Sequence, residues 1–275
     1  MDILSKSFDV TQSRFRCSQY RHRILNISQK VSALHIGGSF SSIEIVDVIY
    51  YGFIRNPNSL HSPDIFIMSK GHSCLSQYAV LESLGIIRHE DFDLYCKSNG
   101  YIGVHPDRGN PGIHASTGSL GHGLAIAIGM AYAEIINKRN GIVYVVISDG
   151  ELQEGSTWEA LMLAANLNLK NIIVFLDHNG FQSFGKTSLT HPAFYPIKDK
   201  IQAFGWEYIE VNGHDSSEMF EKIKSEIGQK PVFVCANTTK GKGVSFMENN
   251  PIWHYRSPDL AEYTQALVEV SNFLA

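Results

Sequence analysis

The sequence has few cysteines, no long apolar run and no excess of one charge, and each absence excludes a class of protein. Its four cysteines are far apart and form no Cys-x-x-Cys pair, which argues against a disulfide framework or a zinc cluster. The longest apolar runs have the length of a strand and the start lacks a signal-peptide pattern, so we expect a cytoplasmic protein without a membrane span. A net charge of -4, with scattered basic residues, leaves no patch for nucleic acid.

Short β-branched runs alternate with helix-like segments along the chain. With 275 residues, 44% of them hydrophobic, the chain can bury a full core. Alternation of this kind predicts an α/β fold, a doubly wound and mostly parallel sheet with helices on both faces. The runs expected to form strands are 65–69, 142–147, 172–177, 206–211 and 232–236.

Local signals also predict some helix boundaries and loops. Ser41 and Glu44 have capping-box spacing ahead of an apolar stripe, which predicts a helix start there. Another helix is expected over about 153–167. Two long segments rich in glycine and histidine, 97–123 and 180–196, are expected to be loops, and loops of this length are usually functional or disordered.

An acidic residue, Asp149, follows the apolar run in the stretch "ISDGELQE", and its role decides the functional interpretation. Asp-Gly is often only a turn, and the Asn179-Gly180 step by itself suggests a hairpin. If the two strands are neighbours in a βαβ unit, however, Asp149 and Asn179 lie beyond their carboxyl ends, where open α/β sheets bind ligands. Two such oxygens suit Mg²⁺ that completes its shell with phosphate and water. The pair therefore predicts a phosphate ligand.

The stretch "DGELQEGSTWEALMLAANLNLKNIIVFLDHNG" resembles the cofactor motif of transketolases, which opens Gly-Asp-Gly and closes on Asn. The resemblance implies that the side chains of Asp149 and Asn179 and the main chain of Phe181 hold Mg²⁺, or Ca²⁺ or Mn²⁺ in its place. In that family the metal binds the diphosphate of thiamine diphosphate. The resemblance identifies residues 1–275 as a single diphosphate-binding domain of the thiamine-diphosphate fold.

Further motifs in the family's order extend the resemblance over nearly the whole chain. They are "LHIGGSFSSIEIVDVIYY", "MSKGHSCLSQYAVLESLG", "GVHPD", "ASTGSLGHGLAIAIGMAYA" and "TTKGKG" followed by "WHYRSP". The resemblance implies that His35 faces the substrate, that His105 meets a hydroxyl of the donor, and that His72 binds the diphosphate. The implied catalytic residues are His35, His105 and His254, and the implied cofactor ligands are Lys70, His72, Gly118, Ser119, Leu120, Gly150, Glu151, Asn179, Lys240 and His254.

The sequence departs from the usual family form at several positions, none of them a metal ligand or an implied catalytic histidine. Ser148 replaces a glycine and adds only a hydroxymethyl group, so we expect cofactor binding to survive. Ser183, Phe184 and Tyr255 fall near the reacting carbon, which puts the usual sugar-phosphate substrates in question. The remaining departures are Leu34, His114 and His122.

The resemblance covers only one of the two domains between which transketolases bind their cofactor. It implies the amino-terminal subunit of a split enzyme that moves a two-carbon ketol unit between sugars or sugar phosphates. Such a chain is active only with a separate pyrimidine-binding subunit, in an α2β2 heterotetramer, and Glu154 and Glu159 fall where the family has acids at the dimer contact. Two alternatives stay open: half of another thiamine-diphosphate carboligase that makes an unusual sugar, or a non-catalytic binding subunit.

Overall fold

The parallel sheet expected from the alternating runs is present in the computed structural model, which describes residues 6–183 and 185–272. Over these residues the chain forms a five-stranded parallel sheet in the order β1-β2-β3-β7-β6, and a small antiparallel hairpin, β4–β5. The five expected strands match the strands of the parallel sheet, with each boundary within one residue of the observed one. The observed strands of this sheet are β1 Ile65–Met68, β2 Val143–Ser148, β3 Ile172–His178, β6 Glu207–Asn212 and β7 Val232–Asn237, and the hairpin adds β4 Phe181–Gln182 and β5 Gly185–Lys186.

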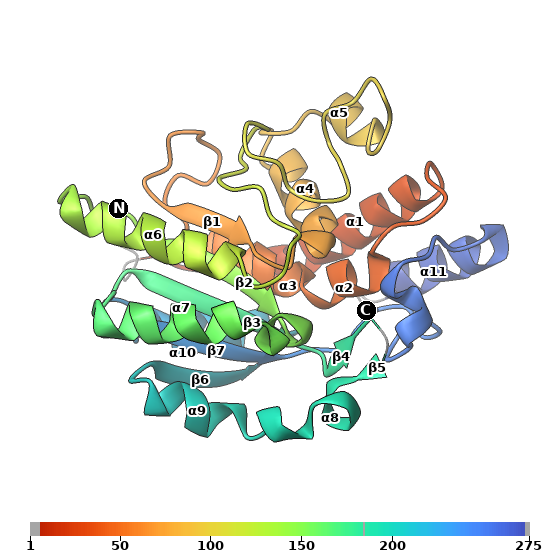
Figure 1. Ribbon diagram of the computed structural model, residues 1–275. Helices are drawn as coiled ribbons and strands as arrows, with labels where there is room; N and C mark the ends of the chain where they lie inside the picture. The colour runs from red at the N-terminus through yellow and green to blue at the C-terminus, as the bar shows by residue number, and fades with distance from the viewer. Residues whose placement is uncertain (1–5, 184, 273–275) are drawn as a thin grey trace.

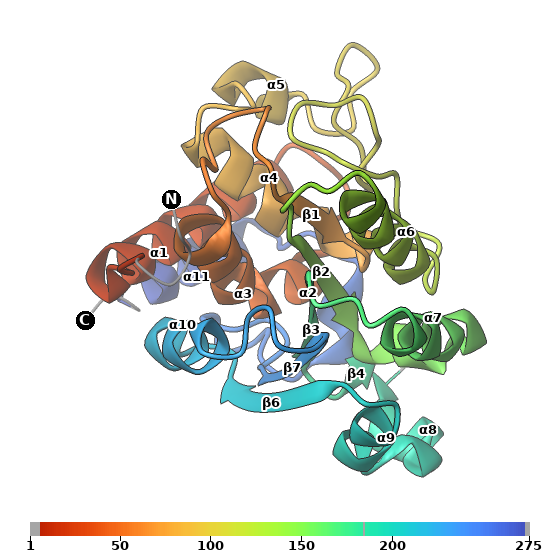
Figure 2. The ribbon, with the colours of Figure 1, turned by 90° about the vertical axis from the view of Figure 1, so that its left-hand side faces the viewer.

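Helices cover both faces of the sheet, because successive strand side chains point to opposite sides and both sets are apolar. In β2, Tyr144 and Val146 pack into one core, whereas Val143 and Val145 pack into the other. Figure 2 shows the sheet between its two helical layers. One layer contains α1 Val10–Ser28, α2 Ile36–Ser41, α3 Ile43–Asp47, α4 Cys74–Ser83, α5 His89–Asp93, α10 Ser216–Lys224 and α11 Leu260–Asn272; the other contains α6 Gly123–Ile136, α7 Gly155–Asn166 and α9 Ile197–Ala203.

The order of the strands explains why the sheet is doubly wound. From β1 to β2 to β3 the chain moves one way across the sheet, with α6 and α7 on the same face. It then passes through α9 to the edge strand β6 and returns through α10 to β7, between β3 and β6. Because crossover connections are right-handed, the reversal of direction places α10 on the opposite face. The predicted fold class is confirmed.

Parallel pairing brings the carboxyl ends of distant strands to one edge of the sheet. The last residues of β2, β3 and β7 are in register, with Ser148 opposite Asp177 and His178 opposite Asn237. The segments that follow the strands therefore meet at this edge, on the side of Figure 1 where α2 and the β4–β5 hairpin are drawn. This edge is where an open α/β sheet binds ligands.

Two local expectations were wrong. Ser41 does not cap a helix: it is the last residue of α2, and its hydroxyl donates to Asp177 at 2.5 Å, while Glu44 pairs with Arg21. The segment 180–196 is not an open loop, because it contains the β4–β5 hairpin, α8 (Thr187–Thr190) and a 3-10 turn. At Ser41 a contact with a distant strand replaced the expected cap, whereas the segment 180–196 is ordered by pairing within itself. The segment 97–122 is irregular, as expected.

Three further observations concern the class of protein rather than the site. Within the described ranges, none of the helices is both long and apolar enough to cross a bilayer. Cys17, Cys74, Cys96 and Cys235 are all unpaired, as their spacing predicts. Phe184, one of the departures from the family pattern, lies outside the described residues.

We expect the buried ion pair between Arg21 and Glu44 to contribute strongly to stability. Although burial opposes its ionisation, Arg21 and His214 hold the pKa of Glu44 at about 2, below its ordinary 4.5. The change Glu44→Gln should lower the free energy of unfolding at pH 7 by roughly 3–5 kcal/mol, because it removes one partner of a buried ion pair. Urea denaturation measures this.

The pH dependence gives an independent check. A carboxyl group whose pKa is lower in the folded state stabilises above its unfolded pKa of 4.5 and loses that effect as pH falls toward 2. The stability difference between the native chain and Glu44→Gln should therefore shrink below pH 5. As a control, Lys222→Gln, which breaks an exposed pair with Glu218, should change stability by less than about 0.5 kcal/mol. Equal effects of the two changes would contradict the prediction.

Candidate active site

A crevice lies at the carboxyl edge of the sheet and encloses about 970 Å³ of space open to solvent. Its walls come from the residues before and in α2, the segments after β1, β2, β3 and β7, and the 97–122 loop. Residues far apart in the sequence meet here because most of them follow strands that end at this edge. Of the residues predicted from sequence, the crevice brings together His35, Lys70, His72, His105, Gly118, Leu120, Gly150, Glu154, Asn179, Phe181, Lys240 and His254.

Of the oxygen donors predicted to bind a metal, Asn179 and Phe181 line the crevice, whereas Asp149 lies buried between the lining residues Ser148 and Gly150 and is not itself part of the wall. Asp149 is 3% exposed, and its carboxylate accepts hydrogen bonds from His178 Nδ1 at 2.5 Å and from the Gly180 N–H at 2.7 Å. The Asn179 amide is oriented by the Phe181 N–H, which donates to its Oδ1 at 3.0 Å. These groups and the Phe181 carbonyl are all oxygen donors, the set that a hard cation prefers.

The described residues hold no cluster of three His, Cys, Asp or Glu side chains that could bind a metal alone. The donor set at Asp149 contains only one such side chain. It fits a cation that takes further oxygens from a phosphate group, as the sequence predicts.

A buried ion pair supports this part of the crevice. Lys70, which follows β1, donates to Asp177 of β3, and the two side chains are at most 1% exposed. Asp177 also accepts from the hydroxyls of Ser41 and Thr238. Although burial by itself would raise it, these partners hold the pKa of Asp177 below its ordinary value. Lys70 is therefore largely engaged within the protein, which limits the cofactor contact that the resemblance implies for it.

The implied catalytic histidines and His72 form one cluster. The ring centroid of His35 lies 5.5 Å from that of His72, 6.1 Å from that of His105 and 5.2 Å from that of His254. Lys240 Nζ lies 3.2 Å from His254 Nδ1. His35 Nδ1 is buried and has no hydrogen-bond partner among the described residues. Such a group is available to a ligand.

Burial and mutual proximity keep these histidines neutral. Burial, aided by His254, His105 and Lys240, lowers the pKa of His35 to about 3. Burial and the Lys240 ammonium lower the pKa of His254 to about 4, and the pKa values of His72 and His105 are also lowered by burial. A neutral imidazole has one donor and one acceptor nitrogen, so the cluster can donate hydrogen bonds to hydroxyl groups of a ligand and accept hydrogen bonds from them.

The turn at Gly118-Ser119-Leu120 forms another wall of the crevice. Gly118 has φ +139, and a Cβ there would lie 2.6 Å from the His105 ring, so this position requires glycine. Ser119 is exposed and Leu120 lines the crevice. The glycine thus lets the turn approach His105 closely.

The Glu151 side chain does not line the crevice, so its implied role as a cofactor ligand stays a prediction. Its side chain is fully buried, where it accepts from Ser69 and from the N–H of Gly121. Burial raises the pKa of Glu151 to about 7. Because Gly121 directly follows the Gly118–Leu120 turn, its hydrogen bond to the Glu151 carboxyl group holds the end of that turn in place.

The departures from the family pattern lie at different depths. Ser148 and Ser183 line the crevice, whereas Tyr255 does not; its half-exposed ring lies 4.5 Å from the His35 ring, centroid to centroid. Leu34 is in the core. His114 covers the edge of β1, with Nδ1 3.2 Å from the Phe66 carbonyl, and His122 is exposed at the start of α6.

Sequence reasoning missed several residues of the site. Asp177 and His178 directly precede Asn179 in "FLDHNG", so their position after a strand was a usable signal. Gln153 and Gln182 also line the crevice, and Gln153 Nε2 is buried without a partner. Nothing in the local sequence distinguishes these glutamines from solvated ones.

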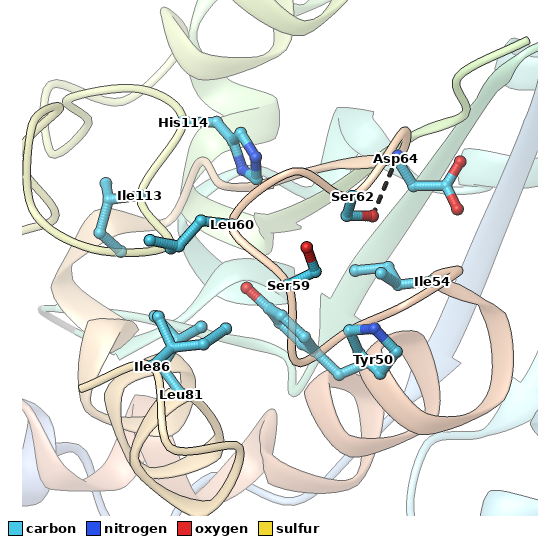
Figure 3. Close-up of a pocket in the computed structure, with 12 residues that line it drawn as sticks. Tyr50, Ile54, Ser59, Leu60, Ser62, Asp64, Leu81, Ile86, Ile113 and His114 are labelled. Atoms are coloured by element: carbon cyan, nitrogen blue, oxygen red, sulfur yellow. Dashed lines mark hydrogen bonds between the residues drawn. The ribbon is translucent and has the colours of Figure 1, made fainter. Parts of the chain in front are cut away.

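A second hollow lies at the opposite, amino end of β1 (Figure 3). Figure 3 shows Tyr50, Leu60, Leu81 and Ile113 around it, with the Asp64 N–H donating to Ser62 Oγ at 3.1 Å. It contains none of the implied cofactor, metal or catalytic residues. The crevice at the carboxyl edge is therefore the candidate active site.

Comparison with known proteins gives the relatives of the whole chain. The family described as "Transketolase, thiamine diphosphate binding domain" matches residues 16–257. An apulose-4-phosphate transketolase subunit of Phocaeicola vulgatus is 35% identical over 258 residues, which cover 92% of this chain and 91% of that protein. The 6-deoxy-6-sulfo-D-fructose transketolase subunit SqwG of a Clostridium species is 36% identical, covering 82% of this chain and 84% of that protein.

Solved transketolases share the fold but are longer. The Campylobacter jejuni transketolase superposes with a TM-score of 0.87 at 25% identity, covering 96% of this chain. The chain spans only 43% of that protein, and 35% of human transketolase, to which it is 33% identical over 219 residues. The chain therefore matches one part of the long proteins and nearly the whole of the subunits.

The neutral state of the histidine cluster can be measured by NMR. The ring protons of His35 and His254 should not titrate between pH 7.5 and 5, because burial and the neighbouring Lys240 lower their pKa values to about 3 and about 4. Lys240→Met removes a positive charge and should raise the pKa of His254. A midpoint above pH 6 in the native chain, or no response to Lys240→Met, would contradict this account of the cluster.

Proposed function

Because this chain belongs to the transketolase family and matches its thiamine-diphosphate-binding domain, we propose that it is the amino-terminal subunit of a split transketolase. In this proposal it transfers a two-carbon ketol unit between sugars together with a separate subunit. The observation that carries the proposal is the convergence of His35, His105 and His254 on the crevice that also contains Asn179. Nearly full-length similarity to proteins named as subunits supports the split organisation.

The inner end of the crevice supports binding of a metal and a diphosphate. Asp149, Asn179 and the Phe181 main chain would hold Mg²⁺, and His72, Lys240 and His254 would contact the diphosphate. Lys240 is 2% exposed, and burial together with the Lys70 charge lowers its pKa to about 8. An anion beside these groups relieves the repulsion between them and favours the charged ammonium.

The outer part of the crevice supports binding of the substrate. Thiamine diphosphate supplies the carbanion chemistry of carbon–carbon bond cleavage, so the protein needs only to orient the sugar and move protons. His35 and His105 lie close together, and a neutral imidazole can accept a hydrogen bond from one hydroxyl group and donate a hydrogen bond to another. We propose these two histidines, with His254, as the catalytic residues.

The Tyr255 ring beside His35 supports a substrate other than the common sugar phosphates. This half-exposed aromatic ring is a departure from the family pattern directly beside a proposed catalytic residue. The similar subunits are named for apulose 4-phosphate and for a sulfonated deoxyfructose. We propose an uncommon sugar as donor or acceptor in this enzyme.

A partner subunit would cover the crevice and exclude water from it. The face next to the crevice carries exposed apolar side chains on α6 and α7, and the acids Glu154 and Glu159. The apolar side chains are Ile126, Tyr132, Ile135, Ile136, Met162 and Leu163. A large exposed apolar patch commonly marks an interaction site. We propose the exposed surface of α6 and α7 as the docking site of the pyrimidine-binding subunit, in a heterotetramer of two copies of each subunit.

We also propose that the enzyme is located in the cytoplasm, where thiols stay reduced.

Mg²⁺ and thiamine diphosphate should bind jointly, because the protein supplies too few ligands to hold the metal without phosphate oxygens. Asp149→Ala should then weaken the affinity for thiamine diphosphate by about 100-fold or more in the presence of Mg²⁺, since loss of a direct ligand exceeds the roughly 10- to 100-fold effect of an outer-sphere one. Calorimetry measures this. The exposed Glu221→Gln serves as the control and should leave affinity unchanged. Unchanged affinity in Asp149→Ala would refute the metal site.

The chain should be inactive alone and active with its partner subunit. Ile126→Glu, on the proposed docking face, should weaken assembly by about 10- to 100-fold, because it places a charge in the apolar contact. Val268→Glu, an equally accessible apolar position on α11, should not. Light scattering follows assembly, and a ketol-transfer assay follows activity. Full activity of the isolated chain would disprove the split-enzyme proposal, and normal assembly of Ile126→Glu would disprove the docking face.

A further inference from the structure

The turn after β3 holds Asp149 from two sides. His178 Nδ1 lies 2.5 Å from one carboxylate oxygen of Asp149, and the Gly180 N–H donates to the other at 2.7 Å. Asn179, which lies between His178 and Gly180, and Phe181, which follows Gly180, are the other proposed metal ligands. One short segment therefore carries two proposed ligands and both donors that orient the third.

These hydrogen bonds leave the carboxylate able to bind a cation. An ionised carboxylate is an acceptor only, so the hydrogen in the contact with His178 lies on Nδ1. Its two oxygens provide about four lone-pair sites, and the two hydrogen bonds use one on each oxygen. The contacts with His178 and Gly180 thus fix the rotation of the carboxylate and leave a lone pair on each oxygen.

The His178 ring is itself held in place. The residue ends β3, and its carbonyl accepts from the N–H of Thr238 at 3.0 Å. Its ring centroid lies 6.0 Å from that of Tyr195, whose hydroxyl is 2.8 Å from Thr187 Oγ1. The His178 side chain is only 21% exposed. A donor supported by strand pairing and ring packing can hold its acceptor in one orientation.

We propose that His178 is a positioning residue for the metal ligand Asp149, acting with the Gly180 N–H. The inference rests on the proposed function, because it assigns a role toward Mg²⁺ and thiamine diphosphate. Mg²⁺ requires nearly ideal octahedral geometry, so a carboxylate that rotates freely binds it less tightly than one held by a neighbour. The His178 side chain does not line the crevice and contacts the Asp149 carboxylate, so it acts on the metal through that carboxylate.

The test compares two changes at this position. His178→Leu removes the donor, whereas His178→Asn keeps an N–H near the position of Nδ1. With saturating thiamine diphosphate, the chain assembled with its partner is titrated with Mn²⁺, and free Mn²⁺ is read from its electron paramagnetic resonance signal. His178→Leu should weaken Mn²⁺ binding by about 10- to 100-fold, and His178→Asn by less than about threefold.

A second measurement separates positioning from general structure. If His178 acts through Asp149, turnover of His178→Leu should return to near the native value at saturating metal, while the metal concentration needed for half activity rises. His191→Leu, in the same connection and stacked on Phe194, is the matched control and should leave Mn²⁺ affinity unchanged. If His178→Leu does not fold, His178→Gln, which moves the donor farther from Asp149, takes its place.

The outcomes are distinct. Native Mn²⁺ affinity in His178→Leu, or equal losses in the Leu and Asn variants, overturns the positioning role. If the native assembly binds neither Mn²⁺ nor thiamine diphosphate, the proposed function itself is wrong. Reduced Mn²⁺ affinity in His178→Leu, restored in His178→Asn, supports the inference.

Discussion

The buried ion pair between Lys70 and Asp177 is the interaction on which the crevice depends. It joins the segment after β1 to the end of β3, and the same carboxylate accepts from Ser41 at the end of α2 and from Thr238 after β7. Lys70 also donates to the Gly38 carbonyl at 3.2 Å. Breaking a buried pair by removing one partner costs roughly 3–5 kcal/mol. The pair therefore links four of the segments that form the crevice walls.

Because that network is satisfied internally, the groups left for ligands are those without partners. His35 Nδ1 and Gln153 Nε2 are buried and unpaired, and an unpaired buried polar group is costly unless a ligand or water binds it. The lowered pKa values of His35 and His254 have the same origin, since burial and nearby cations disfavour charge. The crevice is thus prepared for an anion at its inner end and for hydroxyl groups farther out.

The site also requires close approach of backbone segments, which explains its glycines. A Cβ at Gly71 would lie 2.8 Å from the Gly118 N, and one at Gly118 would overlap the His105 ring. The 97–122 loop is therefore packed against the segment after β1 rather than merely placed near it. Thr117 adds a hydrogen bond to the Met68 carbonyl at 2.6 Å, so the exposed edge of β1 is paired by this loop.

What the sequence determined by itself was the fold class and the five strands of the parallel sheet, each within one residue, and it predicted candidate site residues directly after those strands. Asp149 and Asn179 could be placed because parallel strands end at one edge, and the histidines at 35, 72, 105 and 254 because their motifs resemble a family. The tertiary structure decided which groups these side chains contact. Ser41 binds Asp177 instead of capping a helix, Glu151 is buried beneath a turn, and His178 reaches Asp149. These contacts span 29 to 136 residues of chain, and local sequence carries no information about which distant groups the folded sheet brings together.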